Sequence, residues 1–257
     1  MDKKKLKTYL EELYKKYNKQ EFISPDPLQF LYKYREKADI EIIALIASSL
    51  AYGNVTTILK NIKKVTLTMK NPYIYILSAP EAKIKKDFKD FKHRFTTGEE
   101  ISNLLIALKK IYESYDSLFD FFFGIYNENN TNIIDTLKVF SKYFKQSPTL
   151  IPDVSKGSAC KRLFLFLRWL IRNDNVDIGI WDKIPSSCLI VPVDTHMLNI
   201  SNMLKFTTNK NATLKTAIEI TNNFREITPE DPVKYDFVLT RFGIRKDLNI
   251  SELDYLA

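Results

Sequence analysis

The sequence predicts an all-α, multi-helix protein, and two observations carry that prediction. Only six glycines occur among 257 residues, which is few for a chain built from many tight β-turns. Apolar residues recur mostly at spacings of three and four, which places them on one face of a helix. The length provides for a substantial core and for one or two domains.

The first predicted helix has one apolar face, formed by Leu6, Leu10, Leu13, Tyr14 and Tyr17. Residues 24–27 contain two prolines, so they break this helix and begin a short one over 28–34. Asp39 is expected to cap a strongly apolar helix over 40–52, and Gly53 is expected to end it in the left-handed conformation.

The middle of the chain continues with helices expected over 55–69, 99–115, 117–126 and 133–144. Residues 73–98 are expected to form short helical pieces interrupted by Pro80, because Phe88, Phe91 and Phe95 have helical spacing. Residues 127–132 are polar and predict a loop.

The C-terminal part is expected to contain a long apolar-faced helix over 157–172, a loop over 173–187 and an extended segment over 188–193. Three further helices are expected over 195–206, 213–224 and 232–242. No repeat or flexible linker is visible, so we expect residues 1–257 to form one compact unit, in two helical lobes with a central cleft.

The composition limits the classes of function. A net charge of +8 favours a polyanionic partner, and a solvated lysine-rich surface explains it equally well. Two cysteines exclude a disulfide framework and a four-cysteine iron–sulfur cluster. A zinc site of Cys160, Cys188, His93 and His196 lacks a typical ligand spacing, so no metal is expected. No signal peptide and no 18-residue apolar run are visible, so we expect a cytoplasmic protein without membrane contact.

Lys161 and Asp194 are the candidate chemical groups. Lys161 follows a glycine turn and lies at the start of a helix, where the helix dipole and Arg162 disfavour a protonated amine. A lysine in such a position is a candidate nucleophile, although most lysines are simply solvated. Asp194 precedes a helix and is expected to cap it, and an anchored carboxylate also suits catalysis beside developing positive charge. Backbone amides of the turn formed by Lys156, Gly157 and Ser158 are a candidate phosphate site.

Taken together, these motifs resemble the helix-hairpin-helix DNA glycosylase superfamily. Gly157-Ser158-Ala159-Cys160-Lys161 is similar to the Gly-x-Gly-x-Lys segment of that superfamily, and Val193-Asp194-Thr195-His196 is similar to its aspartate motif. The segment 45–50 resembles the apolar helix that precedes a glutamine-bearing turn in its members. The resemblance extends over about residues 39–206, which would form the glycosylase-like core between added N- and C-terminal helices.

The chain also departs from the superfamily pattern. Ala159 replaces the second hairpin glycine, and residues 51–54 replace the glutamine turn, so Asn54 or Tyr52 would fill the gap left in DNA. The long spacing of 33 residues between Lys161 and Asp194 is similar to the archaeal 8-oxoguanine glycosylase branch. As a whole the chain resembles an uncharacterised bacterial family of this superfamily, through three segments: 166–169, 192–196 and 231–237.

The resemblance implies a base-excision repair glycosylase with AP lyase activity. It would act as a monomer on double-stranded DNA with a damaged base, and an oxidised purine such as 8-oxoguanine is the first substrate to test. Lys161 would be the nucleophile and Asp194 the catalytic carboxylate, with no metal or organic cofactor. The residues implied in DNA contact are Lys156, Gly157, Ser158, Arg162 and Asn54, and those implied at the base are Pro192, Trp169, Tyr235 and Phe237. Two alternatives stay open: a non-catalytic DNA- or RNA-binding protein of the same fold, and a helical scaffold for protein contacts.

Overall fold

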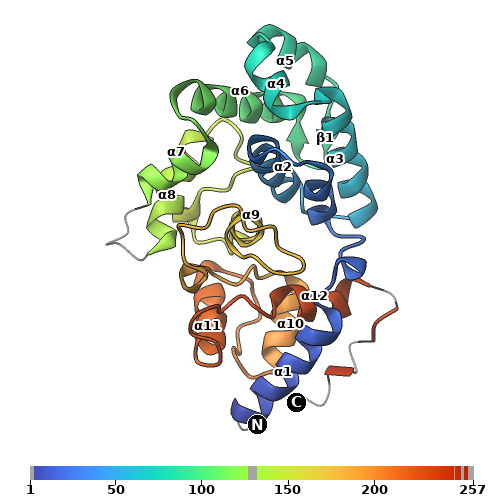
Figure 1. The fold of residues 1–257 in the computed structure, drawn as a ribbon, viewed down its shortest axis with the longest axis vertical. Coiled ribbons are helices and arrows are strands. Elements are labelled where there is room, and N and C mark those ends of the chain that lie inside the picture. The colour runs from blue at the N-terminus through green and yellow to red at the C-terminus, as the bar shows by residue number, and fades with distance from the viewer. Residues whose placement is uncertain (1–2, 127–131, 246, 250–251, 254–257) are drawn as a thin grey trace. The chain divides into compact units, whose positions relative to one another are not determined.

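The computed structural model describes residues 3–126, 132–245, 247–249 and 252–253. In this part of the chain, twelve α-helices and four 3₁₀-helices are joined by turns, and the one sheet has two short strands (Figure 1). The predicted all-α class is therefore confirmed. Among the described residues, no helix combines the length and apolar character needed to cross a bilayer.

The contacts within the chain divide it into two compact units. The middle unit comprises residues 26–156, and the terminal unit comprises residues 1–25 and 157–257. The range 39–206, expected as a glycosylase-like core, includes the boundary between the two units at residues 156 and 157. The packing of residues 1–257 as one compact unit stays a prediction.

The middle unit is built around a buried helix, α2 (Lys37–Ser49), from which ten consecutive side chains from Ile40 to Ser49 are buried. The other elements are η2 (Pro27–Lys33), α3 (Val55–Met69), α4 (Pro72–Ser78), α5 (Glu81–Phe88), β1 (Lys92–His93), β2 (Thr96–Thr97), α6 (Gly98–Ser114), α7 (Leu118–Ile125), α8 (Ile133–Tyr143) and η3 (Val154–Lys156). Strands β1 and β2 pair in antiparallel register, with His93 opposite Thr96.

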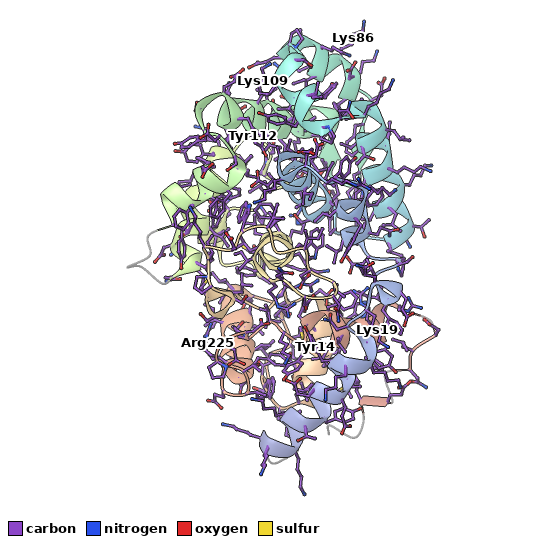
Figure 2. The ribbon with its side chains drawn as sticks, in the orientation of Figure 1. Tyr14, Lys19, Lys86, Lys109, Tyr112 and Arg225 are labelled. Atoms are coloured by element: carbon purple, nitrogen blue, oxygen red, sulfur yellow. The ribbon has the colours of Figure 1, made fainter. Side chains whose placement is uncertain are left out.

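A buried carboxylate joins three helices of this unit. Glu41 on α2 accepts hydrogen bonds from the Tyr112 hydroxyl on α6 at 2.9 Å and from the amides of Leu118 and Phe119 at 3.0 and 3.1 Å. It thus satisfies the amides that α7 leaves unpaired at its start. Tyr112 is labelled in Figure 2, as is Lys109 on the same helix, whose ammonium donates to carbonyl oxygens at the end of α4.

Three local predictions in the middle unit are wrong. Helix α2 begins at Lys37 and not after Asp39, whose carboxylate accepts instead from the Tyr73 amide at 2.8 Å. Gly53 has a φ of +94°, but the helix has already ended at Ser49. Phe95 lies at the tip of the β1–β2 hairpin, because residues 92–97 form strands and not a helix. The predicted loop over 127–132 falls mostly outside the described residues.

The terminal unit comprises α1 (Lys3–Tyr17), η1 (Gln20–Phe22), α9 (Lys161–Ile171), η4 (Ser186–Cys188), α10 (Thr195–Met203), α11 (Leu214–Arg225) and α12 (Asp236–Ile244). Helix α9 is buried from Leu163 to its end. It begins at Lys161, four residues later than predicted, because Cys160 adopts the left-handed conformation with a φ of +48°. Helix α12 likewise begins at Asp236 and not at Pro232.

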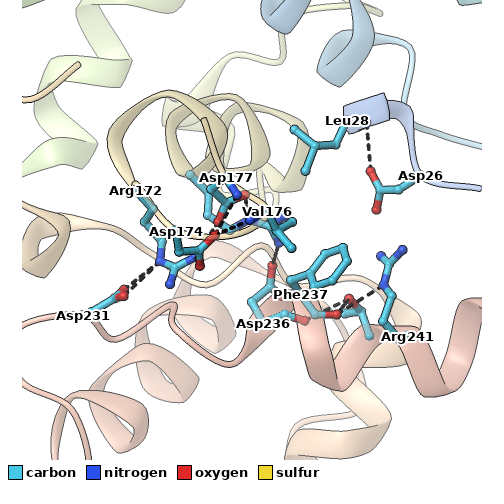
Figure 3. A network of polar contacts seen from close by, with 12 residues as sticks. Asp26, Leu28, Arg172, Asp174, Val176, Asp177, Asp231, Asp236, Phe237 and Arg241 are labelled. Carbon is cyan, nitrogen blue, oxygen red and sulfur yellow. Dashed lines mark hydrogen bonds and ion pairs between the residues drawn. The ribbon is translucent and has the colours of Figure 1, made fainter. Parts of the chain in front are cut away.

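Two buried arginines, Arg168 on α9 and Arg172 directly after it, hold the terminal unit together. Figure 3 shows Arg172 with Asp174, Asp177 and Asp231. Arg168 pairs with Asp177, at 3.2 Å, and with Asp236 on α12. Arg172 also pairs with Asp177, and it contacts Asp231 at 2.9 Å. Asp174 is a further partner of Arg172 and accepts a hydrogen bond from Tyr14 on α1. The network thus ties α9 to the loop that follows it, to α12 and to α1.

Asp177 is the member that serves both guanidinium groups, so we expect its removal to destabilise the fold strongly. Asp177→Ala should lower the free energy of unfolding by about 3–5 kcal/mol, because it takes a carboxylate partner from two buried guanidinium groups at once. Urea unfolding followed by circular dichroism measures this. As a control, Lys83→Ala removes an exposed pair with Asp87 and should cost no more than about 1 kcal/mol. Equal effects of the two substitutions would contradict the structural role of the network.

Candidate functional site

The terminal unit brings Lys161 and Asp194 into direct contact. Lys161 Nζ lies 2.8 Å from Asp194 Oδ2. The side chain of Lys161 is 31% exposed and that of Asp194 is 18% exposed, so solvent and small groups reach the pair. The proximity expected from the sequence is therefore present, between a helix start and a helix cap that are 33 residues apart.

Each partner is fixed by the start of its own helix. Asp194 is the N-cap of α10, and its Oδ1 accepts from the Met197 amide at 2.9 Å. The segment before it has no regular secondary structure, and there the Val191 amide donates to the Thr221 hydroxyl on α11 at 3.0 Å. Lys161 is the first residue of α9, directly after the turn at Cys160. Asp194 therefore keeps one oxygen for its cap and offers the other to Lys161.

The ion pair determines the charge of the carboxylate. Burial opposes the ionisation of Asp194, but the Lys161 ammonium and the hydrogen bonds from Lys161 and Met197 outweigh burial and lower the pKa of Asp194. His196, two residues along α10, acts in the same direction. Asp194 is therefore an anionic group at neutral pH, as a carboxylate must be to stabilise positive charge on a reacting sugar.

The predicted phosphate turn is exposed, and its backbone is partly engaged. Gly157 has a φ of +74°, and its carbonyl accepts from the Leu214 amide at 3.0 Å. Ser158 pairs as an isolated bridge with Thr213, the cap of α11. Lys156, also exposed, is the last residue of the middle unit. Arg162, the second residue of α9, is half-buried.

The four predicted base contacts need correction. Pro192 is buried, and Trp169, Tyr235 and Phe237 are at most 1% exposed. They pack in the core, and the Tyr235 hydroxyl is held by Glu11 on α1 at 2.7 Å. Aromatic rings at helical spacing are here core residues, so in this conformation they cannot stack on a base. The sequence analysis interpreted these aromatic residues as base contacts, whereas their burial shows that they pack in the core.

The two residues predicted to replace the glutamine turn have structural contacts within the middle unit. Asn54 is the N-cap of α3, and its side-chain oxygen accepts from the amides of Thr56 and Thr57 at 3.0 and 3.3 Å. The Tyr52 hydroxyl lies 2.8 Å from the His93 carbonyl oxygen. Both ring nitrogens of His93 also make hydrogen bonds, to Tyr52 and Asn61, so neither is available to a metal. In the described part of the chain, no group of three His, Cys, Asp or Glu side chains is arranged to hold a metal ion.

Sequence reasoning missed the buried groups that support the Lys161–Asp194 pair. Arg168 lies two helical turns after Lys161 on the same face of α9, and it binds Asp236 on α12. On α12, Gly243 lies against His196 so closely that any side chain there would collide with the imidazole. Helix α12 thus contacts both the helix of Lys161 and the helix of Asp194. The spacing of seven between Lys161 and Arg168 was the available signal.

The lowered pKa of Asp194 predicts a specific acid dependence. The pKa of Asp194 in the folded state lies below its unfolded value of about 3.9. The ionised carboxylate therefore stabilises the folded state above about pH 4, and this stabilisation disappears as the pH falls through the folded pKa. Asp194→Asn retains a capping oxygen without the charge. We expect wild type to exceed this variant in unfolding free energy at pH 7, and the difference to shrink below pH 4, measured by urea unfolding. A difference that is the same at pH 7 and pH 3 would rule out the ion pair as its cause.

Comparison with known proteins identifies the family to which the chain belongs. No curated protein and no solved structure matches the chain. The model of one protein family, described as "Protein of unknown function (DUF2400)", matches residues 26–245. This range includes the whole middle unit together with Lys161, Asp194 and the buried network around them. Since it spans well over half of the 257 residues, the chain belongs to the DUF2400 family.

Proposed function

We propose that this protein is a DNA glycosylase with AP lyase activity, in which Lys161 is the nucleophile and Asp194 the catalytic carboxylate. The observation that supports this best is the 2.8 Å contact between Lys161 Nζ and Asp194 Oδ2, at a site that is partly open to solvent. The resemblance to helix-hairpin-helix glycosylases points to the same two residues. The DNA partner of the protein would be a duplex with a damaged base such as an oxidised purine, bound by a cytoplasmic monomer.

The net charge of +8 supports a polyanionic partner. Lysines such as Lys19 and Lys86, both labelled in Figure 2, are exposed to solvent. The damaged nucleotide must leave the base stack before its sugar reaches Lys161. Gly157 and Ser158, exposed and four and three residues before Lys161, are the proposed contacts to a neighbouring phosphate.

The chemistry begins with a proton transfer. Lys161 attacks as a neutral amine, so its proton passes to the Asp194 carboxylate in direct contact with it. A bond forms from Nζ to C1′ of the deoxyribose while the bond from C1′ to the base breaks. The base leaves with the electron pair of that bond and takes the proton from Asp194, which is then again anionic. Asp194 thereby acts as base and then as acid, and the carboxylate regenerated in this way faces the positive charge that the attached amine carries next to C1′.

The second half of the reaction opens the sugar. One proton passes from the attached nitrogen to O4′, and the bond from C1′ to O4′ breaks with its electron pair going to O4′. The lone pair freed on nitrogen then forms the iminium that joins Lys161 to C1′. Loss of a proton from C2′ then expels the 3′ phosphate and cuts the strand. Every atom in these steps comes from Lys161, Asp194, water or the DNA, so the scheme calls on no cofactor.

Borohydride reduction tests the nucleophile. On a duplex with an abasic site, borohydride adds hydride to the iminium carbon and leaves a stable protein–DNA adduct. We expect wild type to form this adduct and Lys161→Gln to form none, as resolved by denaturing gel electrophoresis. Lys215→Gln is a matched control, since Lys215 is also an exposed lysine in the first turn of a helix of the terminal unit. An adduct that persists in Lys161→Gln would show that another amine is the nucleophile.

The rate of adduct formation tests the role of the Asp194 carboxylate. Asp194→Asn retains the cap of α10, so the fold should persist while proton transfer is lost. We expect single-turnover trapping to slow by about 10²-fold or more, followed over time on the same abasic duplex. An unchanged rate would remove Asp194 from the mechanism. Binding of DNA without trapping by wild type would favour the non-catalytic binding protein.

A further inference from the structure

The tip of the β1–β2 hairpin exposes an aromatic ring to solvent. Phe95 is 73% exposed, the highest value for any large hydrophobic side chain in the described part of the chain. Its neighbours in sequence contrast with it, because His93 and Thr96 are almost completely buried. A single exposed apolar side chain is common on protein surfaces, so the support and the neighbours of the ring decide whether it belongs to a binding surface.

The base of the hairpin is held by a buried hydrogen-bond network. The imidazole of His93 donates from Nε2 to the Tyr52 carbonyl at 3.0 Å and accepts at Nδ1 from Asn61 of α3 at 2.9 Å. The Tyr52 hydroxyl contacts both strands, at 2.8 Å from the His93 carbonyl oxygen and 2.7 Å from Thr96 Oγ1. Each strand is therefore fixed next to the tip.

The far side of the hairpin is fixed just as firmly. Thr96 Oγ1 lies 2.7 Å from Thr149 Oγ1, and the Thr149 amide donates to Glu100 at 3.0 Å. Thr97 and Glu100 form a capping box at the start of α6. Because the supports on both sides are ordered, Phe95 is pre-organised, and a ligand need not order the backbone before it contacts the ring.

Arg94 shares the tip and has an unusual backbone conformation. Its φ is +52°, a region that residues with a side chain rarely occupy. Its guanidinium carbon lies 5.5 Å from the centroid of the Phe95 ring. Its side chain passes over Gly53, where a Cβ atom would come within 2.6 Å of Arg94 Cδ. The glycine therefore makes room for an arginine held beside the exposed ring.

The surroundings of the tip are basic. Lys89 and Lys92 are exposed beside the hairpin, and only Asp90 among residues 89–97 is acidic. Helix α3, which reaches the Lys92 carbonyl through Asn61 at 3.3 Å, carries three exposed lysines and no acidic residue: Lys60, Lys63 and Lys64. A phenyl ring beside an arginine, on a lysine-rich part of the chain, fits a ligand with both flat rings and negative charge, which is the chemistry of nucleic acid.

We propose that Arg94 and Phe95 form a DNA-contact tip, in which the Phe95 ring stacks on a base exposed by a gap in the duplex and Arg94 contacts the adjacent phosphate. The inference rests on the proposed function for its choice of DNA, and it adds a residue and a contact that the glycosylase mechanism does not use. It also gives the middle unit a part in binding that Asn54 and Tyr52, occupied in structural contacts, do not supply.

The test is a binding measurement in which Lys161 chemistry plays no part. The probe is a DNA duplex with a tetrahydrofuran abasic-site analogue next to 2-aminopurine, in about 50 mM salt, where phosphate contacts are strong. The analogue has no C1′ leaving group and forms no Schiff base. We expect wild type to change the 2-aminopurine fluorescence, and Phe95→Ala to abolish this change and raise Kd roughly tenfold or more. Phe95→Tyr, which keeps a ring, should behave as wild type.

Controls and outcomes separate this proposal from the enzyme proposal. Ile74→Ala removes another exposed apolar side chain of the middle unit and should leave Kd unchanged. Equal Kd and equal fluorescence for wild type and Phe95→Ala would overturn the DNA-contact tip, even where borohydride trapping succeeds. Binding that depends on Phe95 without any trapping supports the tip and removes the lyase. Dependence on Phe95 for single-stranded RNA but not for the duplex would overturn the choice of DNA.

Discussion

Charge pairing along one face of α9 is the constraint on which the terminal unit depends. Lys161 and Arg168 are spaced by seven residues, so they share a face of α9, and Arg172 is the residue that directly follows the helix. Their acidic partners come from four other places in the chain: the cap of α10, the loop after α9, the segment that leads into α12, and the first residue of α12. Each ion pair fixes the segment that carries the carboxylate relative to α9.

The buried cations of this series are arginines, and the partly exposed one is a lysine. Arg168 and Arg172 are almost completely buried, where arginine remains charged and its planar group binds two or more carboxylate oxygens. The accessible end of the series carries lysine, with a single carboxylate partner. Lysine can give up its proton in a protein and arginine cannot. The series therefore places a permanent charge where structure requires it and a removable charge where a substrate could reach.

Helix α1 contributes to this arrangement although it lies outside the range that matches the DUF2400 family. Glu11 accepts from Lys234 and Tyr235, directly before α12, and Tyr17 packs edge-on against Phe242 near the end of that helix. Helix α12 in turn meets Arg168 and His196. Helix α1 thus holds α12, the helix that contacts both helices of the candidate site. Helix α1 therefore supports the position of Lys161 and Asp194 through α12.

Periodicity predicted helices well where one apolar face decides the structure, as in residues 55–69 and 133–143. It failed where tertiary contacts decide: Asp39 binds an amide of another helix, and residues 92–97 pair as strands because buried His93 and Thr96 anchor them. The Lys161–Asp194 contact was expected from a helix start, a cap and a family resemblance. The Arg168–Asp236 and Arg172–Asp231 pairings were not, since partners that are 68 and 59 residues apart leave no local pattern.

The start of α9 argues that stability alone did not select its residues. The first two positions are Lys161 and Arg162, and the first turn contains no acidic residue. Two cations at the positive end of a helix oppose its dipole, where an acidic or capping residue would stabilise the helix by about 0.3–1 kcal/mol. Asp194 offsets part of this cost, but it does so from another helix and at a partly open position. An unfavourable local choice with a compensating partner is the pattern expected where a residue is retained for its chemistry.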